Sequence, residues 1–140
     1  MVSEHCTRLR MPAQAEHLQA LRAQVRTSAL RQGFAVAAVE DLVLAVNEAC
    51  MNVIQHGYRG AAGEIELTIV ALDDGIEFRV RDDAPRIGLD DWRPRPLDDI
   101  RPGGLGVHFI RATMDHVDYD ISQPEGTVLT LVKQLPQGGE

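Results

Sequence analysis

The stretch GEIELTIVALDDGIEFRVRDD, residues 63–83, decides the fold class of this chain. Apolar side chains alternate with polar ones on both sides of an Asp-Asp-Gly turn: Ile65, Leu67 and Ile69 before it, Ile76, Phe78 and Val80 after it. Such alternation is typical of a strand with one buried face, and Asp-Gly between two such runs is a strong hairpin signal. The stretch therefore predicts an antiparallel β-hairpin.

Two helices and an edge strand are predicted before the hairpin. Residues 13–32 have apolar side chains near helical spacing, and Gly33 follows as a stop signal. These side chains are Leu18, Leu21, Val25 and Leu30. A second helix ends near Gly57, with its apolar positions at Val39, Leu42, Val43, Val46, Ala49, Val53 and Ile54. Residues 4–11 alternate weakly, which predicts an edge strand before Pro12.

After the hairpin, residues 84–102 have no period and are rich in proline, which predicts a long loop of the kind that often forms a functional lid. Glycines then lead into a third helix with Val107, Ile110 and Met114 on one side. Residues 117–122 and 127–135 predict two more strands. This order favours an α+β fold with helices layered on one face of a largely antiparallel sheet. No repeat or second domain is indicated, so residues 1–140 are predicted to form one domain.

Composition narrows the function classes. The chain has 140 residues, of which 44% are hydrophobic, enough for a real core. Its formal net charge of -7, without a long basic run, argues against binding to nucleic-acid backbones. The two cysteines, Cys6 and Cys50, are in no CxxC pair, and we expect both to be reduced thiols. Without a membrane-length apolar run or an apolar signal-peptide core, the chain is expected to be cytoplasmic.

The end of the second helix, VNEACMNVIQHGY (residues 46–58), has an unusual polar stripe. Glu48, Asn52 and His56 are four residues apart and therefore share one helix face. A solvated face is the common explanation, but the neighbouring Ala45, Ala49 and Cys50 are small and mostly apolar. A carboxylate and a carboxamide one turn apart would suit a hydrated Mg²⁺ ion that bridges substrate phosphates. For His56 we expect a structural hydrogen bond instead.

Two further motifs indicate an anionic ligand. In RPGGLGVHFIRATMD (residues 101–115), Gly103, Gly104 and Gly106 precede a helix whose N-terminus would attract an anion, although a flexible loop tip is an alternative. The motif is neither a Walker A loop nor a good dinucleotide fingerprint. At the end of the hairpin, Asp82 or Asp83 could be an ordinary turn residue or could accept a hydrogen bond from an exocyclic amine.

Taken in order, these motifs resemble the N, G1 and G2 boxes of the GHKL ATP-binding superfamily. Within it the chain is similar over nearly its full length to the anti-sigma factor serine/threonine kinases, in LAVNEACMNVIQHGY, RPGGLGVHFIRATMD and GTVLTLVKQL. The resemblance implies a Bergerat fold, which is a two-layer α/β sandwich with a mostly antiparallel mixed sheet and three main helices on one face.

The resemblance also implies residue roles. Glu48 would be the general base and Asn52 the Mg²⁺ ligand. Asp82 would bind the adenine amino group, and Thr127 would lie near the adenine. Gly103, Gly104 and Gly106 would approach the ATP phosphates. The chain departs from the family in its G1 box, where Ala84 and Arg86 replace glycines, and the bulky Arg86 puts ATP affinity and turnover in question.

The implied function is an ATP-dependent serine kinase that phosphorylates an anti-anti-sigma antagonist of the STAS type and sequesters a sigma factor. A homodimer is also implied, with the first strand and first helix at dimer and partner surfaces. One alternative is a nucleotide-binding regulatory module without phosphoryl transfer. Another is the catalytic domain of a two-component histidine kinase, although the chain has no convincing phosphoacceptor helix pair. A purely structural role for all three motifs is the last alternative.

Overall fold

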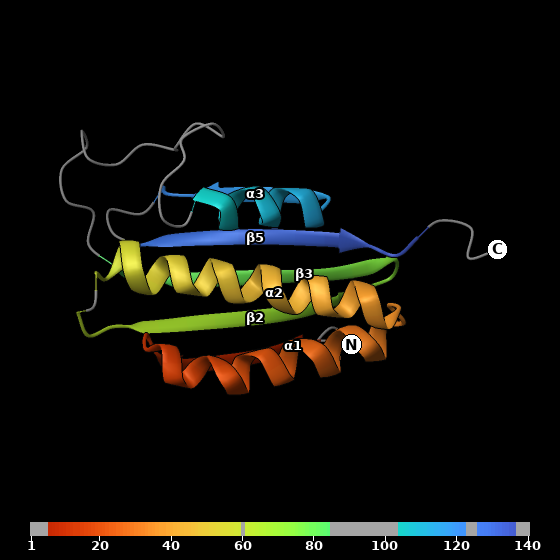
Figure 1. Cartoon of the computed structure of the whole chain (residues 1–140), viewed down its shortest axis with the longest axis horizontal. Helices are drawn as coiled ribbons and strands as arrows, with labels where there is room; N and C mark the ends of the chain where they lie inside the picture. Colours follow the sequence, from red (N-terminus) through yellow and green to blue (C-terminus); the bar gives the residue numbers. More distant parts are fainter. Residues whose placement is uncertain (1–5, 60, 85–103, 123–125, 137–140) are drawn as a thin grey trace.

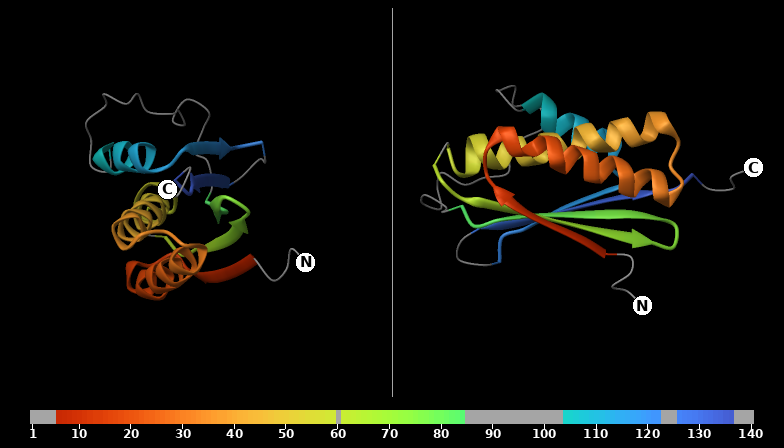
Figure 2. Two further views of the ribbon diagram at one scale, coloured as in Figure 1. Left: turned by 90° about the vertical axis from the view of Figure 1, so that its right-hand side faces the viewer. Right: turned by 90° about the horizontal axis from the view of Figure 1, so that it is seen from below.

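A computed structural model describes residues 6–59, 61–84, 104–122 and 126–136. Within these ranges, three helices cover one face of a five-stranded sheet (Figures 1 and 2). In chain order the elements are β1 (Cys6–Pro12), α1 (Leu18–Gln32), α2 (Val36–Asn52), β2 (Glu64–Leu72), β3 (Gly75–Asp82), α3 (Gly104–Thr113), β4 (His116–Asp120) and β5 (Thr127–Gln134). The predicted two-layer α+β architecture is confirmed.

The sheet has the strand order β1-β2-β3-β5-β4, and all four neighbouring pairs are antiparallel. The predicted hairpin is confirmed as β2 and β3, paired from Leu72 opposite Gly75 to Ile65 opposite Asp82. β5 then pairs with β3 on its other side, from Gly75 opposite Gln134 to Asp82 opposite Thr127. β3 is therefore the central strand, and its last residue lies between β2 and β5.

The core lies between the sheet and the helices, as the alternation in residues 63–83 predicts. Phe78 in the middle of β3 is fully buried, and Ile65, Leu67 and Leu131 are buried on the same sheet face. α1 contributes Leu18, Leu21, Val25 and Ala29, and α2 contributes Val39, Leu42, Val43, Ala45, Val46, Ala49 and Cys50. In Figure 2 the other sheet face is covered by none of the described helices.

The helix boundaries differ in part from the sequence prediction. α1 begins at Leu18, because Ala15–His17 form a separate 3₁₀ turn. Gly33 ends α1 as predicted, with a φ of 100°. Leu30 is 48% exposed, and Ala29 takes the buried position because it continues the four-residue spacing from Val25. None of the helices in the described ranges has the length and apolar character needed to cross a membrane.

Candidate functional site

The predicted site residues that the structure describes lie toward one end of the sheet. There β3 ends at Asp82 and β5 begins at Thr127, and these two residues are direct cross-strand neighbours. The C-terminal end of α2 and the start of α3 lie toward the same end (Figure 1), and α2 packs against α3. A Cβ atom placed on Gly57, after α2, would lie 3.4 Å from the Cβ of Ala84, after β3. The N-box and G1 segments are therefore in contact here.

The structure shows a clear difference between Asp82 and Asp83, the two aspartates between which the sequence motif did not decide. Asp82 continues the alternation of β3 and is 8% exposed, whereas the next residue, Asp83, is exposed. The backbone N–H of Ala84 donates to Oδ1 of Asp82 over 2.9 Å, a local side-chain bond that turns the chain out of the sheet. Asp82 is therefore the buried aspartate of the two at this strand end.

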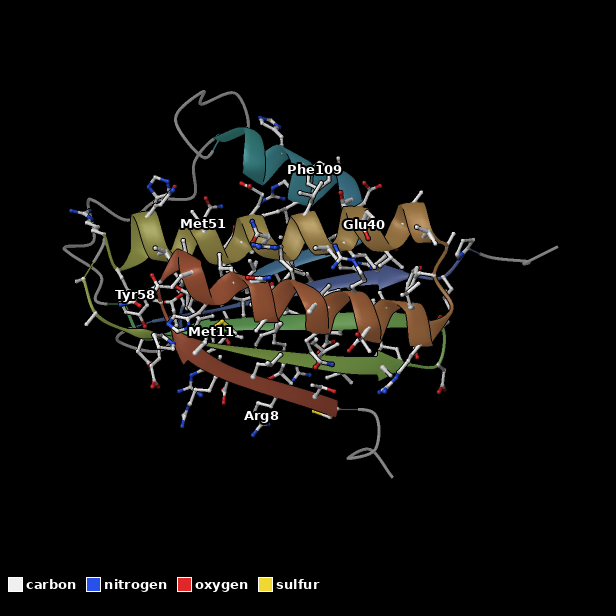
Figure 3. All side chains as sticks on the ribbon, turned by 60° about the horizontal axis from the view of Figure 1, so that its bottom comes forward. Arg8, Met11, Glu40, Met51, Tyr58 and Phe109 are labelled. Atoms are coloured by element: carbon white, nitrogen blue, oxygen red, sulfur yellow. The ribbon has the colours of Figure 1, made fainter. Side chains whose placement is uncertain are left out.

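Tyr58 holds this strand end and was not singled out by sequence reasoning. Its side chain is buried at the end of the sheet near the last turn of α2 (Figure 3). The hydroxyl donates to the carbonyl oxygen of Glu64 over 2.7 Å and accepts from the N–H of Asp83 over 2.9 Å. Its place at the end of the N-box motif was the only signal in the sequence. The periodicity did not predict a contact with the end of β3.

Two glycines allow the chain to approach this strand end closely. Gly126, just before β5, has a φ of 84°, and its N–H donates to the carbonyl oxygen of Ala84 over 3.1 Å. A Cβ atom on Gly126 would lie 2.3 Å from the carbonyl oxygen of Asp82. A Cβ atom on Gly63 would lie 2.2 Å from Cε1 of Tyr58. A side chain at position 126 would force the backbone of Asp82 to move, and one at position 63 would displace the ring of Tyr58.

Glu48 and Asn52 lie one turn apart near the end of α2, and both are partly exposed. Neither side chain forms a hydrogen bond or ion pair with another residue in the part of the chain that the structure describes. The neighbouring Ala45, Ala49 and Cys50 are buried, so the face next to the stripe is not a solvated one.

This pair fits a hydrated magnesium ion, because Mg²⁺ keeps most of its waters and takes one or two oxygen ligands from protein. A cage of three or more His, Cys, Asp or Glu side chains is absent from the residues described. The helix changes character directly after Asn52, because Val53–Gly57 form a π-helical turn. His56 lies in this wider turn and is exposed, so it no longer follows the α-helical spacing of the stripe. Its structural role stays a prediction.

A hollow of about 160 Å³ lies where β3 ends and β5 begins. It is smaller than the roughly 300–1,000 Å³ of typical ligand pockets, and neither Glu48 nor Asn52 lines it. Its lining residues are Arg81, Asp82, Asp83, Asp120, Gly126, Thr127 and Val128. Burial raises the pKa of Tyr58 nearby, which keeps the hydroxyl protonated and able to donate.

The glycine-rich motif is only partly described. α3 begins at Gly104 and includes Gly106, so these two glycines belong to the first turn of the helix instead of preceding it. The N–H groups of a first turn have no partner within the helix and can still face an anion. Gly103, Arg86 and the predicted lid after Ala84 lie outside the described residues.

Comparisons with known proteins agree on one family. The model of the histidine kinase-like ATPase domain matches residues 11–133. The serine-protein kinase RsbW of Bacillus cereus (strain B4264) is 32% identical over 136 residues, covering 91% of this chain and 83% of that protein. RsbW of Bacillus anthracis (strain CDC 684 / NRRL 3495) is 31% identical with the same coverage.

Two solved structures have the same fold. The structure of the RsbU and RsbW domains of Rv1364c from Mycobacterium tuberculosis aligns with a TM-score of 0.67 and 21% identity. This chain is covered to 93% but spans only 32% of that longer chain. The histidine kinase domain of the blue-light activated kinase from Erythrobacter litoralis EL346 aligns with a TM-score of 0.56 and 17% identity, covering 89% of this chain and 62% of that one.

Proposed function

Because the chain belongs to the anti-sigma factor serine/threonine kinases of the histidine kinase-like ATPase family, we propose that it is a cytoplasmic, ATP-dependent protein serine kinase. Its acceptor would be a serine on an anti-anti-sigma antagonist of the STAS type, and it would also sequester a sigma factor as a homodimer. The kinase name of its relatives supports the activity. The partners follow from the family resemblance alone.

One observation carries the catalytic part of this proposal. Glu48 and Asn52 are partly buried, lie one turn apart, and have no partner among the described residues, beside a buried wall of small side chains. A carboxylate and an amide kept in this way are suited to contacts that form only with a ligand. Both side chains are partly exposed, so a ligand in front of α2 could reach them.

The proposed roles follow from the chemistry of each group. Asp82, beside Thr127, would accept a hydrogen bond from the adenine amino group. The amides of Gly103, Gly104 and Gly106, together with the N-terminus of α3, would bind the phosphates. Asn52 would hold Mg²⁺, which when bound would neutralise charge on the phosphate oxygens.

In the transfer step, Glu48 would orient the serine hydroxyl and accept its proton. The bond between the serine oxygen and the γ-phosphorus would form as the bond from that phosphorus to the bridging oxygen breaks, and ADP would leave with that oxygen. Phosphoryl transfer has a loose transition state, so positioning and charge stabilisation would supply most of the rate enhancement.

Incubation with labelled ATP and the cognate antagonist tests the activity. We expect label on a serine of the antagonist, and no transfer by Glu48→Ala although ADP still binds. Glu40→Ala is the matched control, because Glu40 lies two turns earlier on α2 and is exposed beside Arg26 (Figure 3). It should transfer label like the wild type.

The same experiment discriminates the serine kinase from the binding module and from the histidine kinase alternative. A wild-type protein that binds ATP but transfers no label would contradict the kinase and support a binding module. Label on the protein itself, on a histidine, would support the histidine kinase alternative. Equal transfer by wild type and Glu48→Ala would remove Glu48 from the mechanism.

A further inference from the structure

We propose that Tyr58 is the positioning residue for base recognition: its hydroxyl sets where β3 leaves the sheet and thereby aims the carboxylate of Asp82 at the adenine amino group. The inference rests on the proposed nucleotide site and deepens it. Tyr58 does not touch the base in this proposal. It acts through the backbone of the residue that follows Asp82.

The register of the β2–β3 hairpin shows that the Tyr58 hydroxyl takes the place of the next backbone pairing between the two strands. Ile65 opposite Asp82 is the last paired position of β2 and β3, so the next position would place Glu64 opposite Asp83. The Tyr58 hydroxyl bonds to the carbonyl of Glu64 and to the N–H of Asp83, so it lies between those two backbone groups. A side chain from another segment therefore ends this ladder, and the two strands separate at a defined residue.

Tyr58 is itself fixed by its surroundings. The π-helical turn after α2 ends with a bond from the N–H of Tyr58 to the carbonyl of Val53, over 2.8 Å. The ring then passes so close to Gly63 that any other residue there would collide with it. Single π-turns occur often at functional sites, and here the turn places the tyrosine that holds the G1 strand end.

The opposite side of the strand end is held as well. Gly126 donates to the carbonyl of Ala84, and Asp82 accepts from the N–H of the same residue. Residues 82–84 are thus fixed from β2 through Tyr58, from β5 through Gly126, and internally through the Asp82 carboxylate. Of these three constraints, only the one from Tyr58 connects Asp82 to the helix that carries Glu48 and Asn52.

Base discrimination tests the inference. The affinities of wild type and Tyr58→Phe for ADP and for inosine diphosphate, which has a carbonyl in place of the amino group, are measured by calorimetry. A hydrogen bond to a charged group contributes about 1.5–3 kcal/mol, which corresponds to a preference of roughly tenfold or more for ADP in the wild type. We expect Tyr58→Phe to lose most of this preference, through weaker ADP binding with little change for inosine diphosphate.

Tyr119→Phe is the matched control. Tyr119 is 43% exposed and its hydroxyl has no hydrogen bond to a described residue, so its variant should keep the wild-type preference. Gly63→Ala is a second probe, because it keeps the hydroxyl but displaces the ring, and it should lose the preference as Tyr58→Phe does.

The outcomes separate this inference from the proposed function. A Tyr58→Phe protein that is folded and keeps the full ratio of ADP to inosine diphosphate affinity overturns the positioning role, whatever its melting temperature. A wild type that binds ADP without any preference also overturns it. A wild type that binds neither nucleotide overturns the proposed nucleotide site, and the inference with it.

Discussion

Gly126→Ala should destabilise the protein more than an ordinary glycine replacement, because two costs combine at this position. The φ of 84° is a left-handed conformation, which costs an L-residue about 1–2 kcal/mol. The added Cβ atom would also lie 2.3 Å from the carbonyl oxygen of Asp82, which is backbone and cannot rotate away. Shifting it should add about 1–3 kcal/mol, as overpacking does, for a total of about 2–5 kcal/mol.

Gly33→Ala isolates the first cost. Gly33 has a φ of 100°, but no atom lies within 4 Å of the Cβ position, so only the conformational cost of about 1–2 kcal/mol applies. The stabilising effect of alanine on the unfolded chain is the same in both variants and cancels between them. The difference between the two variants therefore measures the close approach of β5 to the end of β3.

Urea denaturation of both variants gives the two free energies of unfolding, and calorimetric titration with ADP gives the effect on the site. We expect Gly126→Ala to lose about 1–3 kcal/mol more than Gly33→Ala and to bind ADP more weakly, because Asp82 must move. Equal losses in the two variants would refute the close approach. A larger loss with unchanged ADP affinity would show that the displacement does not reach Asp82.

Three further predictions concern the core. Phe78→Ala should cost about 3–5 kcal/mol in urea denaturation, because Phe78 is fully buried at the centre of the sheet, and Phe78→Leu should cost less. In the native protein at pH 8, a chromogenic thiol reagent should react with the partly exposed Cys6 but not with the buried Cys50. Burial raises the pKa of Cys50 to about 12. Adding denaturant should make the thiol of Cys50 reactive as well. With this raised pKa, the folded state keeps the Cys50 proton over a pH range in which the unfolded state has lost it. The free energy of unfolding should therefore fall between pH 9 and about 12, with Cys50 contributing at most about 1.4 kcal/mol per pH unit. Cys50→Ala should flatten that slope, and an unchanged slope would assign the loss to other groups.

Most of the fold follows from local pattern. The alternation on either side of the Asp-Asp-Gly turn predicted β2 and β3, because the side chains of a strand with one buried face must alternate. The periodicity of α2 likewise predicted its buried face. Helix ends were harder to predict, since the 3₁₀ turn before α1 and the exposure of Leu30 depend on packing against distant segments.

The residues proposed for the site could be named from the sequence, but the framework around them could not. Glu48 and Asn52 stand out as a polar stripe beside small, mostly apolar residues, whereas the choice of Asp82 over Asp83 came from the family resemblance. The adjacency of Asp82 and Thr127 follows from the register of β3 and β5, which the sequence leaves open because 44 residues separate the two along the chain. Tyr58 and Gly63 do not interrupt the sequence patterns around them, so the sequence did not indicate that they hold the end of β3.

A residue that binds a ligand can be proposed from its chemical type, which the sequence shows. A residue that positions the ligand-binding residue is identified by its contacts, which only the structure shows. At the end of β3, an aspartate, a tyrosine and a glycine fix one short segment from three directions. Such a segment has little freedom to adjust when a ligand arrives, so the binding energy need not be spent on ordering it. If the Tyr58 bridge has this effect, then removing it should weaken ADP binding chiefly through an unfavourable entropy change, and titration calorimetry of Tyr58→Phe can measure that change.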